Sequence, residues 1–328
     1  APLQIGGEPV DVHITLGLAL AVNGDVDASR LIEHALIGLD QARAAHGKVM
    51  VFDPIAYGDP ASNLSLMSEM LEAVRNGDLF LNHQPKLDLR SGQITGVEAL
   101  VRWNHPKRGF LRPDLFVGMA EETGHIRALT DYVLIQAIED QARLRAAGHE
   151  VLMSVNVSGR LIDDQAFAEH AISQVTAAGA NICFEITETA IVCDFDQARA
   201  ALAAFHDLGV RTALDDFGTG HSSLSHLRLL QLDKLKIDAS FVSDIEHNPT
   251  SEDIVRTVLQ LGRNLRMECV IEGVETEAQR DRAAAIHLAE IAHLRSNHTH
   301  ETHILPPGCW VLIRQQRNVN GIWSIVTD

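Results

Sequence analysis

From Leu79 onward, short apolar runs alternate with longer stretches that repeat apolar residues at helical spacing. Runs rich in Val, Ile and Leu are typical of buried strands, and the repeating stretches are typical of amphipathic helices. Strands are expected at 79–88, 95–102, 151–157, 182–187, 210–214, 233–237 and 268–273, with helices between most of them, for example at 130–147, 160–178, 196–208 and 251–266. This alternation predicts a parallel sheet, either doubly wound or closed as a barrel.

The first 56 residues have the pattern of a separate, small α/β unit. Val10 to Val22 indicates a strand, Asp25 to Ser29 can start a helix that ends at Gly47, and Val49 to Phe52 indicates a second short strand. Residues 57–78 are expected to form a linker and a connecting helix that leads into the larger domain.

Polar side chains recur at or near the carboxyl ends of the strands expected in the larger domain. They are Glu98, Asn156, Glu185, Glu188, Asp215, Asp216, Lys236 and Glu272. A barrel gathers the carboxyl ends of its strands into one mouth. A single buried glutamate is usually a structural ion pair, but that explanation does not account for so many polar groups at successive strand ends.

The adjacent carboxylates Asp215 and Asp216 follow a strand and precede a turn that begins at Gly218. An unpaired buried carboxylate is very costly, so this pair indicates a site for a metal and a phosphate. Ser222 and Ser223 are expected to cap a helix that starts near Leu224.

Composition and charge limit the classes of molecule that the chain is expected to bind. The chain of 328 residues has a formal net charge of −17 and no basic stripe, which disfavours duplex nucleic acid. The scattered cysteines predict reduced thiols in the cytoplasm. No apolar run reaches the ~18 residues of a membrane span, and no signal peptide is recognised. An upstream sensor or membrane-anchored region in a longer parent chain is left open.

Several motifs occur in order along residues 79–285. They are Gly96–Pro106, Ser154–Ser158, Phe184–Thr189, Leu214–Leu224, Leu235–Asp238 and Ile271–Thr276. In these motifs the chain resembles the EAL-domain cyclic di-GMP phosphodiesterases. The resemblance implies a TIM-like (β/α)8 barrel whose first strand is antiparallel to the others. It also implies hydrolysis of one phosphodiester bond of cyclic di-GMP, which gives linear pGpG.

The resemblance also implies roles for individual residues. It places Glu98, Asn156, Glu185, Asp215 and Asp216 as metal ligands. Their oxygen atoms suit Mg²⁺ or Mn²⁺ in a two-metal site. Glu272 is placed as general base or orienter of the attacking water, Lys236 as the group that steadies developing charge, and Glu188 as the residue that holds the Asp215–Ser223 loop. Gln84, Arg102 and Glu275 match substrate-binding positions. We also expect a homodimer formed through the barrel.

The first unit carries a second resemblance. Ile14–Ala19 and Ala42–Lys48 resemble the C-terminal half of a GGDEF domain, degenerate or truncated, within residues 1–56. The signature of the cyclase is not among these residues, so we assign the unit no catalytic role.

The tail, residues 286–328, departs from the family. About twenty residues after Glu272 the family has a Gln-Gly-Tyr strand that closes the barrel, but here Ala292 stands where the glutamine is expected. Either Cys309–Ile313 or Gly321–Val326 could replace the eighth strand, or the barrel stays open, which would loosen the site and slow turnover. The histidines at 293, 298, 300 and 303 could chelate a metal or belong to a loosely packed tail. His221 replaces the usual tyrosine.

Two other functions are therefore kept beside the metal-dependent phosphodiesterase. One is a catalytically weak or inactive regulatory module that binds cyclic di-GMP. The other is a protein-interaction and dimerisation scaffold. The intact ligand set favours the enzyme, and the missing closing motif favours the alternatives.

Overall fold

The computed structural model describes residues 3–5, 8–10, 15–20, 28–44, 49–52, 60–193, 195–218, 227–297 and 309–313. The chain divides into two compact units, Ala1–Ser68 and Glu69–Asp328. The predictions for His221, for the helix cap at Ser222 and Ser223, and for the tail histidine side chains lie outside what is described.

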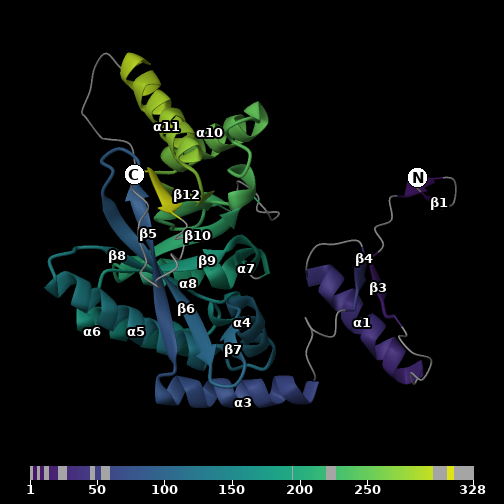
Figure 1. Cartoon of the computed structure of the whole chain (residues 1–328). Coiled ribbons are helices and arrows are strands. Elements are labelled where there is room, and N and C mark those ends of the chain that lie inside the picture. Colours follow the sequence, from purple (N-terminus) through teal and green to yellow (C-terminus); the bar gives the residue numbers. More distant parts are fainter. Residues whose placement is uncertain are drawn as a thin grey trace. The chain divides into compact units, whose positions relative to one another are not determined.

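The first unit contains two small sheets (Figure 1). β1 (Leu3–Ile5) and β2 (Glu8–Val10) are antiparallel, whereas β3 (Leu16–Leu18) and β4 (Val49–Val51) are parallel and are joined through α1 (Ala28–Ala44). Gly17 lets α1 approach β3 closely, because a Cβ there would lie 2.1 Å from the carbonyl oxygen of Ala35. The strand predicted over 10–22 extends too far, since β3 ends at Leu18 and residues 19 and 20 are not in a strand.

The second unit is built on a closed ring of eight strands. Each strand pairs with the next, and β5 pairs with both β6 and the last strand of the ring. The ring consists of β5 (Leu79–Asp88), β6 (Ile94–His105), β8 (Leu152–Asn156), β9 (Ile182–Thr187), β10 (Arg211–Phe217), β11 (Lys234–Ile237), β12 (Glu268–Val274) and β13 (Cys309–Ile313). β5 is antiparallel to both its neighbours, and the other pairings within the ring are parallel. The predicted barrel with an antiparallel first strand is confirmed.

The eighth strand comes from the tail. Helix α11 (Glu277–Asn297) occupies the region where the closing strand was expected, so the strand follows later in the chain. β13 pairs in parallel with β12 and antiparallel with β5, and Figure 1 shows it in yellow beside the blue β5. Of the alternatives left open by the sequence, Cys309–Ile313 is the segment that fills the gap, and the barrel is closed.

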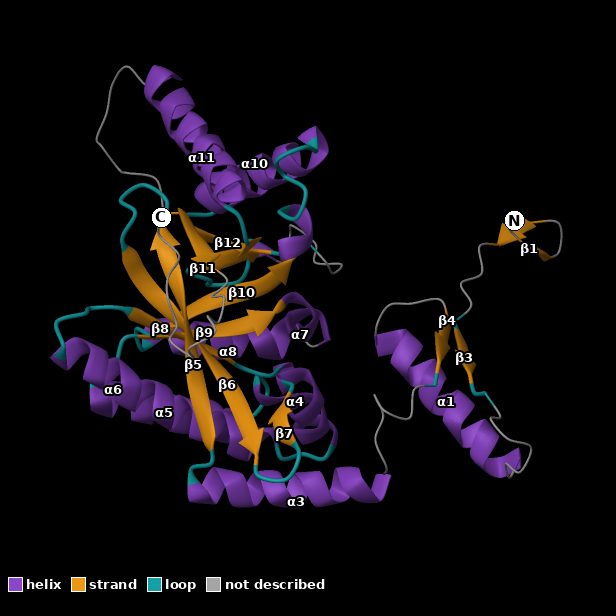
Figure 2. Cartoon of the chain, viewed as in Figure 1, coloured by secondary structure: helices purple, strands orange, loops and turns teal. Residues whose placement is uncertain are grey.

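Helices surround the barrel strands, as Figure 2 shows in purple around orange. They are α4 (Pro113–Glu122), α5 (Ile126–Ala146), α6 (Gln165–Ala178), α7 (Glu188–Cys193), α8 (Phe195–Asp207), α10 (Pro249–Asn264) and α11, with short 3-10 turns η1 (Gly159–Leu161) and η2 (Ala239–Phe241). Helix α3 (Pro60–Asn76) spans the boundary between the two units and precedes β5. β7 (Gly109–Leu111) extends the sheet beyond β6. The helix predicted over 160–178 is divided, because Asp164 accepts a hydrogen bond from the Phe167 amide at 3.0 Å and starts α6 anew.

Strand alternation decides which residues reach the interior of the barrel. On β9, Phe184 points outward and packs edge-on against Phe205 of α8, with ring centroids 5.1 Å apart. Cys183 points inward and clusters with Leu152 and Ala213. Because side chains two residues apart share a face, Glu185 points inward as well, above this apolar layer.

Removal of β13 is expected to abolish cooperative folding of the barrel. A chain that ends at residue 308 would leave β5 and β12 as unpaired edges, which are sites of instability and aggregation. A chain that ends at residue 313 keeps β13 and is the matched control. Thermal melts followed by circular dichroism should show one sharp transition for the control only. Equal melting of the two truncated chains would contradict a closing role for β13.

Candidate active site

Lys236 stands at the centre of the barrel mouth. The residue is 1% exposed, and its ammonium contacts carboxylates from four other strands. The distances from Nζ are 2.6 Å to Glu185 Oε2, 2.7 Å to Glu272 Oε1, 2.8 Å to Asp215 Oδ2 and 3.5 Å to Glu98 Oε2. An ammonium carries three protons, so these carboxylates share one donor group. The predicted residues from β6, β9, β10, β11 and β12 therefore meet at one point.

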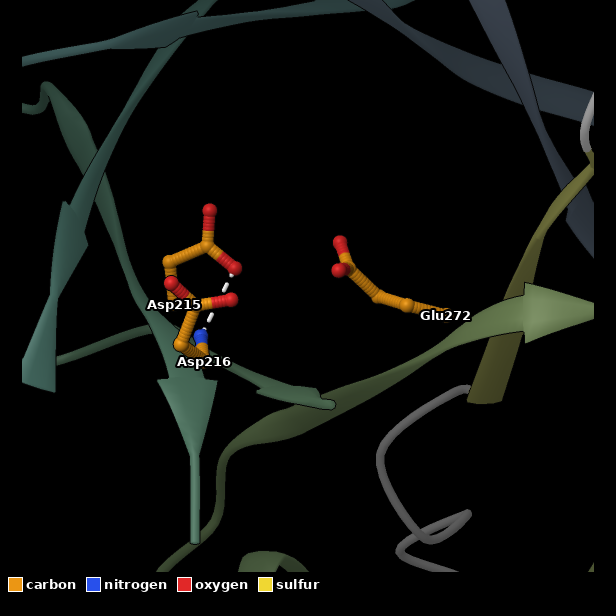
Figure 3. A group of neighbouring side chains, drawn as sticks. All are labelled: Asp215, Asp216 and Glu272. Atoms are coloured by element: carbon orange, nitrogen blue, oxygen red, sulfur yellow. Dashed lines mark hydrogen bonds between the residues drawn. The ribbon is translucent and has the colours of Figure 1, made fainter. Parts of the chain in front are cut away.

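Asp215, Asp216 and Glu272 form a second group at the same mouth (Figure 3). One oxygen from each of the three lies within 4.8 Å of the others. Asp216 has a φ of 54°, a left-handed conformation that aspartate tolerates better than most residues. Its amide donates to Asp215 Oδ1 at 2.8 Å. The backbone at this position therefore brings two successive carboxylates to face Glu272 instead of alternating across the strand.

Asn156, at the end of β8, joins the first group through Glu98. Its Nδ2 donates to Glu98 Oε1 at 2.8 Å, which leaves the Asn156 Oδ1 as an acceptor. Glu98 is 5% exposed and lies on β6, the strand next to β8. The two residues thus offer oxygen atoms beside those of Glu185 and Asp215.

Glu188 follows β9 and acts on the chain after the two aspartates. Its Oε2 accepts a hydrogen bond from the Gly218 amide at 3.0 Å. Gly218 has a φ of 103°, and a Cβ there would come within 2.6 Å of the Phe241 ring, so only glycine fits. Glu188 and Phe241 together fix the point where the chain leaves β10. The rest of the predicted loop, from residue 219, is outside the described part.

The three predicted substrate-binding residues are spread around the mouth. Gln84 lies opposite Glu98 in the β5–β6 register. Arg102, on β6, is half-buried and donates to the Val101 carbonyl at 2.9 Å. It lines a cavity of about 320 Å³ together with Pro113, Glu121, Asn156, Glu185 and Thr187. Glu275 is exposed just after β12, and its amide donates to Gln279.

Sequence reasoning missed two charged residues of the site. Lys86 is buried on β5, where it donates to Ser154 Oγ at 2.8 Å and pairs with Glu185. Asp238 follows β11, and its charge adds to burial and to Asp215, the larger causes, in raising the pKa of Asp216. Lys86 stands two residues after Gln84 on β5, so strand alternation could have identified it, whereas Asp238 lies just beyond the end of β11.

Burial and neighbouring charges move the pKa values of the carboxyls in opposite directions. Burial, with help from Asp215, raises the pKa of Glu272 to about 8, although Lys236 opposes the change. Burial, with Glu185, also raises the pKa of Glu98. For Glu185 the effect of burial is outweighed by Lys236 and Lys86, and the pKa is lowered to about 2. The site therefore combines a firmly ionised carboxylate with one that can hold a proton near neutral pH.

Stability in the presence of a chelator should depend on pH through Glu272. Its pKa of about 8 in the folded protein lies above its ordinary value of 4.5, so the folded chain holds a proton that the unfolded chain has released. Stability from this group is complete below pH 4.5 and is lost as the pH rises towards 8. The Tm of the wild-type chain should therefore fall over this window relative to that of Glu272→Gln. Parallel Tm curves for the two proteins would contradict the raised pKa.

The residue types of the mouth fit a divalent metal. All the ligand atoms on offer are carboxylate or amide oxygens, which hard ions such as Mg²⁺ and Mn²⁺ prefer. Two buried oxygens, Glu185 Oε2 and Glu272 Oε1, accept no aligned hydrogen bond within the described part and contact the Lys236 ammonium as ion pairs. They keep acceptor capacity that a cation could use.

The EAL domain family matches residues 67–289 of this chain. The chain belongs to the EAL domain family.

Relatives with assigned names cover most of this chain. Cyclic di-GMP phosphodiesterase NbdA of Pseudomonas aeruginosa PAO1 is 35% identical over 305 residues, which is 90% of this chain and 37% of that protein. Cyclic di-GMP phosphodiesterase PdeR of Escherichia coli K12 is 32% identical over 279 residues, covering 84% of this chain and 42% of that protein. The chain thus spans less than half the length of these relatives.

Solved structures agree with the fold. The PaMucR phosphodiesterase in complex with c-di-GMP superposes with a TM-score of 0.63 at 33% identity, covering 68% of this chain and 92% of that one. The EAL enzyme Bd1971, bound to cAMP and cyclic di-GMP, gives a TM-score of 0.64 at 27% identity, covering 80% of this chain and 70% of that one.

Among the described residues, no helix is both long enough and apolar enough to span a membrane.

Proposed function

We propose that this chain hydrolyses one phosphodiester bond of cyclic di-GMP to give linear pGpG, with two Mg²⁺ or Mn²⁺ ions. The carboxylates of four strands gathered around one buried lysine carry the proposal. Such an arrangement costs too much desolvation to serve the fold alone. The names of the relatives NbdA and PdeR and the ligand of PaMucR supply the substrate.

In this proposal the ligands divide into two sets that share Asp215. One set is Glu98, Asn156, Glu185 and Asp215, which meet around Lys236 and the Glu98–Asn156 hydrogen bond. The other is Asp215, Asp216 and Glu272. When bound, the ions would supply positive charge at the scissile phosphate and favour deprotonation of the attacking water.

Protein side chains would orient the reactants and accept the proton of the attacking water. Glu272 accepts the proton of the attacking water, because it is the carboxyl whose pKa is raised to about 8 and it faces the aspartate pair. Lys236 stays charged, holds Glu272 in place and offsets charge that develops on the phosphate. Arg102 suits a phosphate oxygen pair, and Gln84 and Glu275 lie where they could contact the rest of the dinucleotide.

Glu188 would act on the geometry of the two aspartates. Its hydrogen bond to the Gly218 amide fixes the exit of β10, two residues after Asp216. A change there would move the aspartates without removing a ligand. Asp238, beside Asp216, adds to the negative charge on that side of the mouth.

Glu98→Gln provides the test of this function, because it removes a charge while keeping the size of the side chain. We expect turnover of cyclic di-GMP, followed by chromatography of the product, to fall by about a hundredfold or more with Tm little changed. The matched control is Glu268→Gln, since Glu268 also pairs with a buried lysine but at the opposite end of β12. Near-normal turnover in Glu98→Gln, or an equal loss in Glu268→Gln, would contradict the assigned site.

The proposal also covers the origin of residues 1–56 and the oligomeric state of the chain. We infer that residues 1–56 derive from the C-terminal half of a GGDEF domain, which the parallel β3–α1–β4 arrangement supports. The β3–β4 sheet also leaves Leu16, Leu18, Val49 and Val51 between 42% and 51% exposed, as expected for part of a larger α/β domain.

We also propose that the chain forms a homodimer through the barrel. Light scattering of the purified chain tests this, because it measures the mass of the particle in solution.

A further inference from the structure

Lys86 is a buried cation that the mechanism above does not use. Its side chain is 4% exposed and extends from β5 into the barrel, passing over Gly96 of β6. The ammonium donates to Ser154 Oγ at 2.8 Å and to Glu185 Oε1. A buried lysine is costly unless it is paired, and here both partners lie in the interior layer just beneath the mouth.

Glu185 is thereby held between two ammonium groups. Lys86 takes Oε1 from the β5 side, while Lys236 lies 2.6 Å from Oε2 on the β11 side. Glu185 itself is 1% exposed, so solvent does not compete for either oxygen. Its two oxygens are consequently not equivalent, since only Oε2 faces the carboxylates that gather around Lys236.

We propose that Lys86 is a positioning residue that restricts Glu185 to ligation through one oxygen and so favours Mg²⁺ or Mn²⁺ over Ca²⁺. Lys236 shares its charge with Glu98, Asp215 and Glu272, whereas the other printed partner of Lys86 is the neutral hydroxyl of Ser154. A cation at Oε1 would therefore meet the less compensated of the two ammonium charges, which disfavours chelation by both oxygens. Mg²⁺ requires near-octahedral coordination by single oxygens, whereas Ca²⁺ takes more ligands and accepts two-oxygen carboxylates. The inference rests on the metal site of the proposed function, and it assigns the choice of ion to a residue outside the ligand set.

The test is calorimetric titration of the whole chain with MgCl₂ and with CaCl₂, without substrate. The readout is the ratio of the Ca²⁺ Kd to the Mg²⁺ Kd. Loss of a positive charge strengthens the binding of both ions, so the ratio isolates the geometry. We expect Lys86→Met to lower the ratio about tenfold, because Glu185 can then ligate Ca²⁺ through both oxygens.

Two control variants separate positioning from a purely structural role. Ser154→Ala removes the other acceptor of Lys86 but keeps the contact with Glu185. Lys234→Met removes a similarly buried lysine, 5% exposed, that pairs with Glu268 instead. Both are expected to lower Tm and to leave the ratio within about twofold of the wild-type value, since neither changes the ligation of Glu185.

The outcomes are distinguishable. An unchanged ratio in a folded Lys86→Met protein overturns the role of Lys86, and a wild-type chain that binds neither ion contradicts the proposed metal site itself. Should Lys86→Met not fold, Lys86→Gln keeps a polar group without the charge, and its ratio should fall at least about threefold. Failure of both variants to fold would assign Lys86 to the fold alone and also overturn the proposal.

Discussion

Lys236→Met is expected to abolish turnover and to destabilise the barrel strongly. The ammonium of Lys236 lies within 2.8 Å of the carboxylates of Glu185, Asp215 and Glu272, and methionine would leave them facing one another without it. Breaking a buried ion pair by removing one partner costs about 3–5 kcal/mol. Denaturant unfolding should show a loss of this size, and no pGpG should form at any metal concentration.

Lys234→Met is the matched control for this variant. Lys234 lies two residues earlier on the same strand and is 5% exposed, but it pairs with Glu268, away from the mouth. Its loss should cost stability while turnover per folded molecule persists. Turnover by Lys236→Met comparable with that of Lys234→Met would show that the lysine at the centre of the carboxylates is dispensable.

Chelation of divalent ions should lower turnover by about three orders of magnitude or more, because bound cations contribute several kcal/mol to phosphate chemistry. The mouth holds Glu98, Glu185, Asp215, Asp216 and Glu272, and their charges would repel a dianionic dinucleotide. Added Mg²⁺ or Mn²⁺ should restore the rate. EDTA saturated beforehand with Mg²⁺ is the control and should leave the rate unchanged. Turnover that survives exhaustive dialysis against EDTA would rule out a metal-dependent reaction.

The barrel strands could be predicted from the sequence because each is a short apolar run bounded by turns. All seven predicted strands are present, and β5 and β9 match their predicted bounds. β13 could not be placed in advance, since its position follows from pairing with β12 and β5, far away in the chain. Short helices such as α4 and α7 were also missed, as few residues carry their periodicity.

The electrostatics of the site were harder to predict from the sequence than its residues. Asp215 and Glu272 could be proposed from their places at strand ends, but the sharing of one lysine among them depends on distances in three dimensions. Lys86 was not singled out because its partners, Ser154 and Glu185, are 68 and 99 residues away in the chain. Strand alternation could have placed Lys86 on the same face as Gln84, but the pairing of Lys86 with Glu185 depends on the closed barrel.

Hydrolysis of cyclic di-GMP in water enriched in oxygen-18 tests the central claim most directly. Attack of water on phosphorus predicts that the purified chain with Mg²⁺ or Mn²⁺ forms pGpG carrying one oxygen-18 atom in its terminal phosphate, as seen by mass spectrometry. The Glu98→Gln protein and the chelated wild-type protein should give almost none. Absence of pGpG from the metal-loaded wild-type chain, or labelled product that forms equally well with chelator, would contradict the account.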